Sequence, residues 1–225
     1  MENIEKLVKE LLNDDNGHGF DHVERVRELA LGFTEQEGAD RYVVELSVLL
    51  HDVDDYKLFG AENAEHLTNA NRILSTSDVS DETKLAVLEI IGTMGYSKYL
   101  EGTRPVSLEG QIVSDADMCD AIGAQGILRT YSYNTSKGVV FFDKDAPPVD
   151  SGVDPQQYRS VKNAHAVQHF FDKMLVIPSI LMTRSGREEG DKRLHVMVEF
   201  LGELFREERA TEWSQYLERF LVRKV

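Results

Sequence analysis

Cysteine is almost absent from this chain, since Cys119 is the single one among 225 residues. One thiol cannot form a disulfide within the chain, so a small disulfide-stapled scaffold is excluded. No apolar run reaches membrane-spanning length, and the first residues, Met1–Lys6, have neither the basic region nor the apolar core of a secretory signal. We therefore expect a cytoplasmic protein that does not insert into a membrane.

Basic residues are few relative to acidic ones. The chain has 25 Lys and Arg against 40 Asp and Glu, which gives a formal net charge of -15. An acidic surface repels the phosphate backbone of nucleic acids and anionic lipid headgroups. We therefore expect no nucleic acid and no membrane among the partners, and a small phosphorylated molecule is a better candidate substrate.

Apolar residues recur at helical spacing along most of the chain. The segments with this spacing are 4–12, 22–33, 43–53, 61–74, 85–91 and 194–205. A hydrophobic content of 41% is sufficient for the core of one domain of this length. The pattern predicts an all-α fold with a single domain over residues 1–225. Its metal-site core would lie at about 15–130, with C-terminal helices at about 156–222 packing on that core.

Two stretches do not follow the helical pattern. A short apolar run at 137–142 is followed by Pro147-Pro148, which predicts a short irregular or strand-like insertion around 138–155. The residues 184–193 are mostly charged and predict a connection before the last helix. These stretches add no second domain to the expected helical bundle.

Polar residues that could bind a metal occur inside the apolar helical segments. Val26 and Phe33 follow His22 at spacings of four and eleven, so a helix would place the imidazole of His22 on its buried face. The doublet His51-Asp52 lies near the end of the apolar run 43–53. A buried polar side chain is costly unless it is hydrogen-bonded or bound to an ion. The pattern therefore indicates a metal-dependent hydrolase.

A third polar cluster lies in the apolar segment 112–122. Asp117 and Asp120 are three residues apart and would share one face of a helix, and Asp115 precedes them. The segment therefore offers carboxylates to the same site.

This ordered set of motifs resembles the HD-domain superfamily of metal-dependent phosphohydrolases. The superfamily pattern is a helical His, a His-Asp doublet at the end of a helix and a later Asp. The motifs are also similar to those of a bacterial branch that includes nucleotide pyrophosphohydrolases, and the similarity continues at 168–175 and Met182-Thr183. The resemblance implies one HD-domain helical bundle. It also implies four metal ligands, which are His22, His51, Asp52 and Asp117.

Two imidazoles and two carboxylates suit a single divalent ion. Mn²⁺ or Mg²⁺ is the first expectation, and Co²⁺, Ni²⁺ or Fe²⁺ also accept this donor set. A two-residue shift in the motif would exchange Asp117 for Asp115 as the last ligand, so both stay candidates. His66 is the only histidine between Asp52 and Asp117, and the apolar face of its segment largely excludes it. We therefore expect one metal ion.

Six further residues are candidates for chemistry around the metal. The catalytic candidates are Asp55 and Lys57, and the substrate-binding candidates are Arg25, Arg129, His169 and Lys173. A flexible lysine or an arginine can bind phosphate, and a carboxylate can orient or deprotonate water. Five of the six have a structural alternative: a solvated loop for Asp55 and Lys57, a salt bridge for the arginines, and packing or exposure for His169 and its helical neighbour His165.

The resemblance implies hydrolysis of (deoxy)nucleoside triphosphates to the monophosphate and pyrophosphate. The same metal centre could instead serve a nucleoside monophosphatase or a cyclic-nucleotide phosphodiesterase, because the pocket selects which phosphorus is attacked. A non-catalytic nucleotide-sensing module is the third alternative. It stays open because the branch has a histidine near residues 90–96 and this chain has none there.

Overall fold

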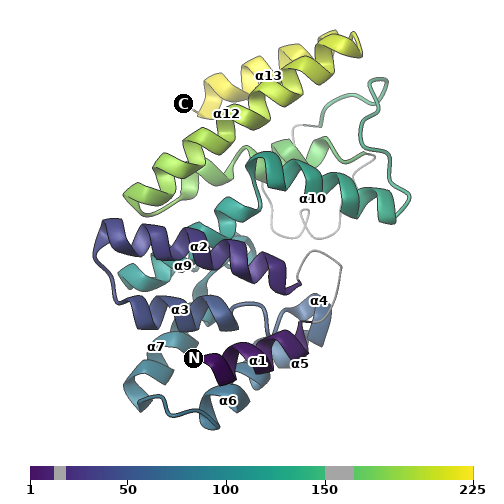
Figure 1. Cartoon of the computed structure of the whole chain (residues 1–225). Coiled ribbons are helices and arrows are strands. Elements are labelled where there is room, and N and C mark those ends of the chain that lie inside the picture. Colours follow the sequence, from purple (N-terminus) through teal and green to yellow (C-terminus); the bar gives the residue numbers. More distant parts are fainter. Residues whose placement is uncertain (13–18, 150–164, 225) are drawn as a thin grey trace. The chain divides into compact units, whose positions relative to one another are not determined.

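The structure is a computed structural model that describes residues 1–12, 19–149 and 165–224 (Figure 1). Within these ranges every regular element is a helix, which confirms the all-α prediction. The chain divides into two compact units. The first unit comprises Met1–Asp117 and Met182–Ser185, and the second unit comprises Met118–Leu181 and Gly186–Val225. None of the described helices is both long and apolar enough to cross a bilayer.

The first unit is built around α3 (Arg41–Leu50), which packs against helices α1, α2 and α7. The side chains of Val44, Leu46 and Val48 to Leu50 are fully buried, so α3 forms the centre of this core. Its other helices are α1 (Glu2–Leu11), α2 (Phe20–Glu37), α4 (Tyr56–Phe59), α5 (Ala61–His66), α6 (Thr68–Ser75), α7 (Asp81–Thr93), α8 (Tyr96–Leu100) and all but the last turn of α9 (Leu108–Asp120).

The connection between α2 and α3 is only three residues long, and each of its ends is chemically specified. Helix α2 ends at Gly38, whose φ of 78° lies in the left-handed region that glycine adopts without strain. Asp40 then caps α3 by accepting hydrogen bonds from the amides of Tyr42 and Val43 at 2.8 and 3.3 Å. The short turn makes α2 and α3 antiparallel neighbours, as Figure 1 shows.

Arg27 joins three helices of the first unit. Its guanidinium, on α2, donates to Glu5 of α1 at 3.2 Å and to Glu45 of α3. A planar guanidinium can serve two carboxylates at once, so one side chain fixes α1 and α3 against α2.

The second unit consists of the end of α9, α10 (Gly123–Ser136), the five-residue π-helix η1 (Phe170–Met174), the 3₁₀ helix η2 (Ile177–Ile180), α12 (Arg184–Glu207) from Gly186 onward and α13 (Thr211–Lys224). Its core is aromatic. The rings of Phe142, Phe171 and Phe205 lie 5.2 to 5.8 Å from one another or from the buried Trp213. The packing of the C-terminal helices on the metal-site core stays a prediction.

The expected insertion around 138–155 is irregular over its described part. Residues 139–149 contain neither helix nor strand, and 150–155 lie outside the described residues. Side chains of the second unit hold the last described residues before 150. Trp213 Nε1 donates to the carbonyl of Ala146 at 2.9 Å. The side-chain amide of Gln168 accepts from the backbone N–H of Val149 at 3.1 Å and donates to its carbonyl at 2.9 Å. These hydrogen bonds satisfy backbone groups of a segment that has no helix or strand to pair them.

Two expectations about helices were wrong in detail. The segment 61–74 is two helices, because Leu67 has a φ of 48° and interrupts the helical path. The charged stretch 184–193 is the beginning of α12 rather than a connection. Glu189 pairs with Arg193 at 2.7 Å and with Lys192 at 3.5 Å, and such pairs one turn apart support a helix without an apolar stripe.

Two glycines of the second unit provide a test of this packing. A Cβ at Gly126 would lie 2.4 Å from the carbonyl oxygen of Ala121, whereas a Cβ at Gly202 meets nothing within 4 Å. We expect Gly126→Ala to lower the free energy of unfolding by about 1–3 kcal/mol through overpacking. Gly202→Ala, the matched control, should raise it by about 0.5–1 kcal/mol through helix propensity. Urea unfolding followed by circular dichroism measures both, and stabilisation by both variants would contradict the packing around α10.

Candidate metal centre

His22 enters the site from the first turn of α2. Val23 and Val26 on the same helix are fully buried, and His22 itself is only 2% exposed. The sequence prediction that this imidazole lies on a buried helix face is therefore confirmed. The backbone amide of His22 donates a hydrogen bond to the carbonyl of Gly19 at 2.9 Å, which fixes the residue near the start of the helix.

His51 and Asp52 follow directly after the buried helix α3. The His51 ring nitrogen Nδ1 lies 2.7 Å from the carbonyl oxygen of Val48. A carbonyl can only accept, so Nδ1 carries the hydrogen and Nε2 keeps its lone pair in the neutral ring. This is the arrangement in which a histidine binds a metal through Nε2 while a backbone carbonyl orients the ring.

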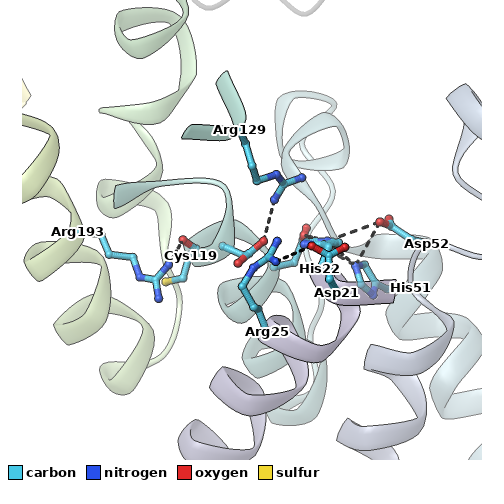
Figure 2. A network of polar contacts seen from close by, with 10 residues as sticks. Asp21, His22, Arg25, His51, Asp52, Cys119, Arg129 and Arg193 are labelled. Atoms are coloured by element: carbon cyan, nitrogen blue, oxygen red, sulfur yellow. Dashed lines mark hydrogen bonds and ion pairs between the residues drawn. The ribbon is translucent and has the colours of Figure 1, made fainter. Parts of the chain in front are cut away.

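The two histidines and Asp52 converge on one point, as Figure 2 shows. The Nε2 atoms of His22 and His51 are 3.2 Å apart, and Oδ2 of Asp52 is 3.6 Å from each of them. Asp117 comes from α9 and places its Oδ1 at 3.5 Å from the first Nε2 and 3.9 Å from the second. The structure thus brings together all four residues that the sequence proposed as ligands.

These distances and donor types fit a divalent cation. Metal–donor bonds of about 2.1 Å in an octahedron separate neighbouring donors by roughly 3.0 Å and opposite donors by about 4.2 Å. The contacts of 3.2 to 3.9 Å observed here lie between these two values. Burial favours the neutral acid of Asp117, but in the metal-free site the hydrogen bond from His22 and the positive charge of protonated imidazoles outweigh it, so the pKa of Asp117 lies below its ordinary value. A bound cation would supply that positive charge in place of the ring protons. The carboxylate is therefore ionised and suited to bind a cation.

Asp115 is committed to a different role from Asp117. It is fully buried, and its carboxylate accepts hydrogen bonds from the amides of Met182 and Thr183 at 2.7 to 3.0 Å and from the Thr183 hydroxyl at 2.8 Å. Glu37 of α2 similarly accepts from the amide and hydroxyl of Ser185, both at 2.7 Å. Asp115 thus fastens the segment Met182–Ser185 to α9 within the first unit, and the geometry favours Asp117 as the fourth donor.

A second group of residues lies beside the doublet, and sequence reasoning missed it. Asp54 is 5% exposed and accepts from the amides of Asn69 and Ala70 in α6, both at 2.9 Å. The Asn69 side chain donates in return to the carbonyl of Val53 at 2.8 Å. Asp54 stands in an acidic run, so no local pattern distinguishes it from its neighbours.

Asp55 and Lys57 lie where the chain leaves the doublet. Asp55 caps α4, because its Oδ1 accepts from the amide of Lys57 at 2.9 Å. The Lys57 side chain is exposed, and its Nζ lies 5.7 Å from the centre of the Tyr56 ring. Both residues are in the first unit, a few residues from Asp52, and their catalytic roles stay predictions.

The basic candidates are divided between the units. Arg25, one turn after His22, pairs with the exposed Asp21 at 3.0 Å. Arg129 belongs to the second unit and pairs with the buried Asp120 at 2.8 Å, a contact also drawn in Figure 2. His169 directly precedes η1, and Lys173 lies within that π-helix. The two arginines have the salt-bridge partners that the sequence left as an alternative, and contact of all four side chains with a substrate stays a prediction.

The remaining histidines of interest are explained by their surroundings. His165 is 2% exposed and packs edge-on against Phe142 and Trp213, with ring centres 5.6 and 5.1 Å away. Burial lowers the pKa of His165 and keeps the ring neutral. His66 is exposed at the end of α5. Neither belongs to the cluster of His22.

Comparison with known proteins identifies relatives along most of the chain. Residues 19–122 match the family model described as HD domain. The YpgQ protein of Bacillus subtilis is 32% identical over 205 residues, which cover 90% of this chain and 91% of YpgQ. A solved structure of YpgQ in complex with ADP has a TM-score of 0.68 at 26% identity, covering 91% of this chain and 97% of YpgQ.

Two further solved structures are similar over almost their full length. A protein from Lactobacillus plantarum matches with a TM-score of 0.79 at 32% identity, and the match covers 93% of this chain and 96% of that protein. A protein from Bacillus thuringiensis, described as an HD-superfamily hydrolase, has a TM-score of 0.71 at 30% identity with the same coverage. The similarity therefore includes far more than the segment that carries the four donors.

The contrast between Asp115 and Asp117 can be tested with the same substitution at both sites. We expect Asp117→Asn to weaken Mn²⁺ binding at least about tenfold while the unfolding free energy of the metal-free protein changes by less than about 1 kcal/mol. Asp115→Asn should lower the unfolding free energy by about 1–3 kcal/mol, because buried donors lose their acceptor. Calorimetric Mn²⁺ titration and urea unfolding in EDTA measure these quantities, and the reverse outcome would make Asp115 the ligand.

Proposed function

The chain belongs to the HD-domain superfamily of hydrolases, and on this premise we propose that it is a metal-dependent phosphohydrolase. Its substrates would be (deoxy)nucleoside triphosphates, which it would split to the monophosphate and pyrophosphate. It would bind one divalent ion, Mn²⁺ or Mg²⁺, through four ligands: His22, His51, Asp52 and Asp117.

The observation that supports this proposal most strongly is the convergence of the four donor groups. They come from the start of α2, the end of α3 and the last turns of α9, so the core of the first unit holds all of them. The side chains of His22 and His51 are 2% exposed, whereas those of Asp52 and Asp117 are 13% and 26% exposed. Water and a phosphate can therefore approach the centre from the side of the carboxylates.

The residues of the chain would divide the work of hydrolysis between them. A divalent ion bound at such a centre supplies Lewis acidity toward a phosphoryl oxygen and lowers the pKa of a water molecule. His51, oriented by the carbonyl of Val48, keeps Nε2 available as a ligand. Asp55 would orient the attacking water or accept its proton with the carboxylate oxygen that does not cap α4. Lys57 would neutralise the phosphate chain as a flexible point charge.

A local supply of positive charge is needed because the chain as a whole carries -15. Arg25 is the nearest arginine in sequence to His22 and would contact a phosphate oxygen by exchanging its exposed partner Asp21, whose ion pair contributes little. Arg129, His169 and Lys173 of the second unit are proposed as further contacts to the substrate. They could bind phosphate or ribose oxygens through charged or ring N–H donors.

The choice of a nucleotide as substrate is supported by two observations. YpgQ, a relative that aligns with 90% of this chain, has been crystallised with ADP. The motifs around the doublet and at residues 168–175 are also similar to those of nucleotide pyrophosphohydrolases. Release of pyrophosphate rather than orthophosphate rests on that similarity.

The decisive experiment treats metal-stripped protein with Mn²⁺ or Mg²⁺ and a panel of nucleoside triphosphates, monophosphates and cyclic nucleotides. We expect the monophosphate and pyrophosphate from triphosphates only when metal is added. Asp52→Ala should reduce turnover by at least about 100-fold and abolish Mn²⁺ binding, while the helical circular dichroism spectrum stays unchanged. Orthophosphate or an opened cyclic nucleotide as product would overturn the substrate assignment. Full metal content in the variant would remove Asp52 from the ligand set.

The role of Lys57 can be separated from that of the metal ligands. Lys57→Ala should lower kcat/KM for a nucleoside triphosphate by about 10- to 100-fold, the usual effect of losing a hydrogen bond to a charged group. Binding of Mn²⁺ should not change, because Lys57 is outside the ligand set. Lys84→Ala is the matched control, since Lys84 lies in α7 of the same unit and pairs only at 3.4 Å with the exposed Asp81 among the contacts described. Equal kinetics for both variants would exclude Lys57 from substrate binding.

A further inference from the structure

Asp54 stands out among the acidic residues after the doublet because it is buried and points away from solvent. It is two residues beyond Asp52, and its two carboxylate oxygens are each occupied by a backbone amide of α6. Oδ1 accepts from Asn69 and Oδ2 from Ala70, both at 2.9 Å. The two amides belong to the first turn of α6, where backbone donors have no partner within the helix. The negative charge also lies at the favourable end of the helix dipole.

The contact is reciprocal. The side-chain amide of Asn69 donates to the carbonyl of Val53 at 2.8 Å, and Val53 is fully buried. Three hydrogen bonds therefore join the two residues after the doublet to the start of a helix fifteen residues further along the chain. Charge-assisted bonds to a carboxylate in a buried place are stronger than ordinary ones, so this junction is rigid.

The doublet is held on its other side as well. The ring of His51 is tied to the carbonyl of Val48, and the carbonyl of Asp52 accepts from the amide of Asp55 at 3.1 Å. Helix α3 therefore holds the chain before Asp52, and the hydrogen bonds of Val53 and Asp54 to α6 hold it after Asp52, so the backbone of Asp52 has little conformational freedom. A ligand carboxylate on a fixed backbone loses less conformational entropy when it binds an ion.

We propose that Asp54, together with Asn69, is a positioning residue of the metal centre: it sets the direction of the Asp52 carboxylate by fixing the chain to α6. This inference rests on the proposed metal site. Asp54 would not touch the ion or the substrate, and its effect would reach the centre through the backbone of Val53 and Asp52.

An ordinary helix cap would behave differently, and the same unit contains one for comparison. Asp40 accepts from two amides at the start of α3, as Asp54 does at the start of α6, but it lies at the opposite end of α3 from His51. Eleven residues with a rise of about 1.5 Å each place it roughly 16 Å from His51 along the helix. Asp40→Asn therefore controls for the general loss of a charged cap.

The test is calorimetric titration of the full-length, metal-stripped protein with Mn²⁺, at a temperature well below the unfolding midpoint of every variant. Asp54→Asn keeps the shape of the side chain but replaces one accepting oxygen with an NH₂ group, which then faces a backbone N–H of α6 that has lost its acceptor. We expect it to weaken the Kd for Mn²⁺ by about 10- to 100-fold, the range known for residues that orient metal ligands. Asn69→Ala, which removes only the bond to Val53, should weaken the Kd by about three- to tenfold, below that range. Asp40→Asn should leave the Kd within about twofold of wild type.

The possible outcomes distinguish failure of the proposed metal site from failure of the positioning role of Asp54. If the wild-type protein does not bind Mn²⁺, the proposed metal site itself is wrong. If the wild type binds and both Asp54→Asn and Asn69→Ala keep its Kd, the site stands and the positioning role is refuted. An equal loss in Asp40→Asn would also refute it, because the effect would then belong to helix capping in general. Should Asp54→Asn fail to fold, Asn69→Ala alone decides.

Discussion

The close approach of two imidazoles and two carboxylates is the constraint around which the first unit is organised. Contacts of 3.2 to 3.9 Å join the Nε2 atoms of His22 and His51 to each other and to oxygens of Asp52 and Asp117. The carboxylates of Asp52 and Asp117, which both contact these imidazoles, repel each other unless positive charge lies between them. In the proposed metal site a divalent cation would provide that charge and would offset the repulsion. The buried helix α3 and the tie by Arg27 between α1, α2 and α3 keep the donors from moving apart.

The aspartates of the first unit show how one residue type takes different roles according to what it faces. Asp52 and Asp117 face the imidazoles, whereas Asp54 and Asp115, each two residues from a ligand, face backbone amides. The carboxylate of Asp54 accepts from amides of α6, and that of Asp115 accepts from amides of the segment Met182–Ser185. Asp55 lies between these cases, since one of its oxygens caps α4. Two of these aspartates would bind metal, and the others make the geometry of those two possible.

The acidity of the chain limits how a phosphorylated substrate can be held. With a net charge of -15, the long-range field opposes an anion, so affinity must come from the ion and a few nearby cations. The side chains of Asp52 and Asp117 are more accessible than those of the histidines, which places the open side of the centre at the carboxylates. Lys57 and Arg25 are in the same unit as the centre and have exposed or partly exposed side chains. Under the proposed function we therefore expect metal loading to be the main control on substrate binding.

The sequence by itself determined the helical class of the fold and three of the four residues that meet in the first unit, His22, His51 and Asp52, and it left Asp115 and Asp117 as candidates for the fourth. Helical periodicity is local, and the order of His22, His51-Asp52 and Asp117 is a pattern that can be seen without coordinates. It did not determine that 184–193 is helical, because the support there comes from charge pairs and from the packing of Gly190 against Leu181. Only the tertiary structure decided between Asp115 and Asp117, because the partners of Asp115 lie 67 and 68 residues away. The same holds for Asp54 and α6: a carboxylate acquires its role from the donors that the folded chain brings to it, and spacing along the chain does not encode which donors arrive.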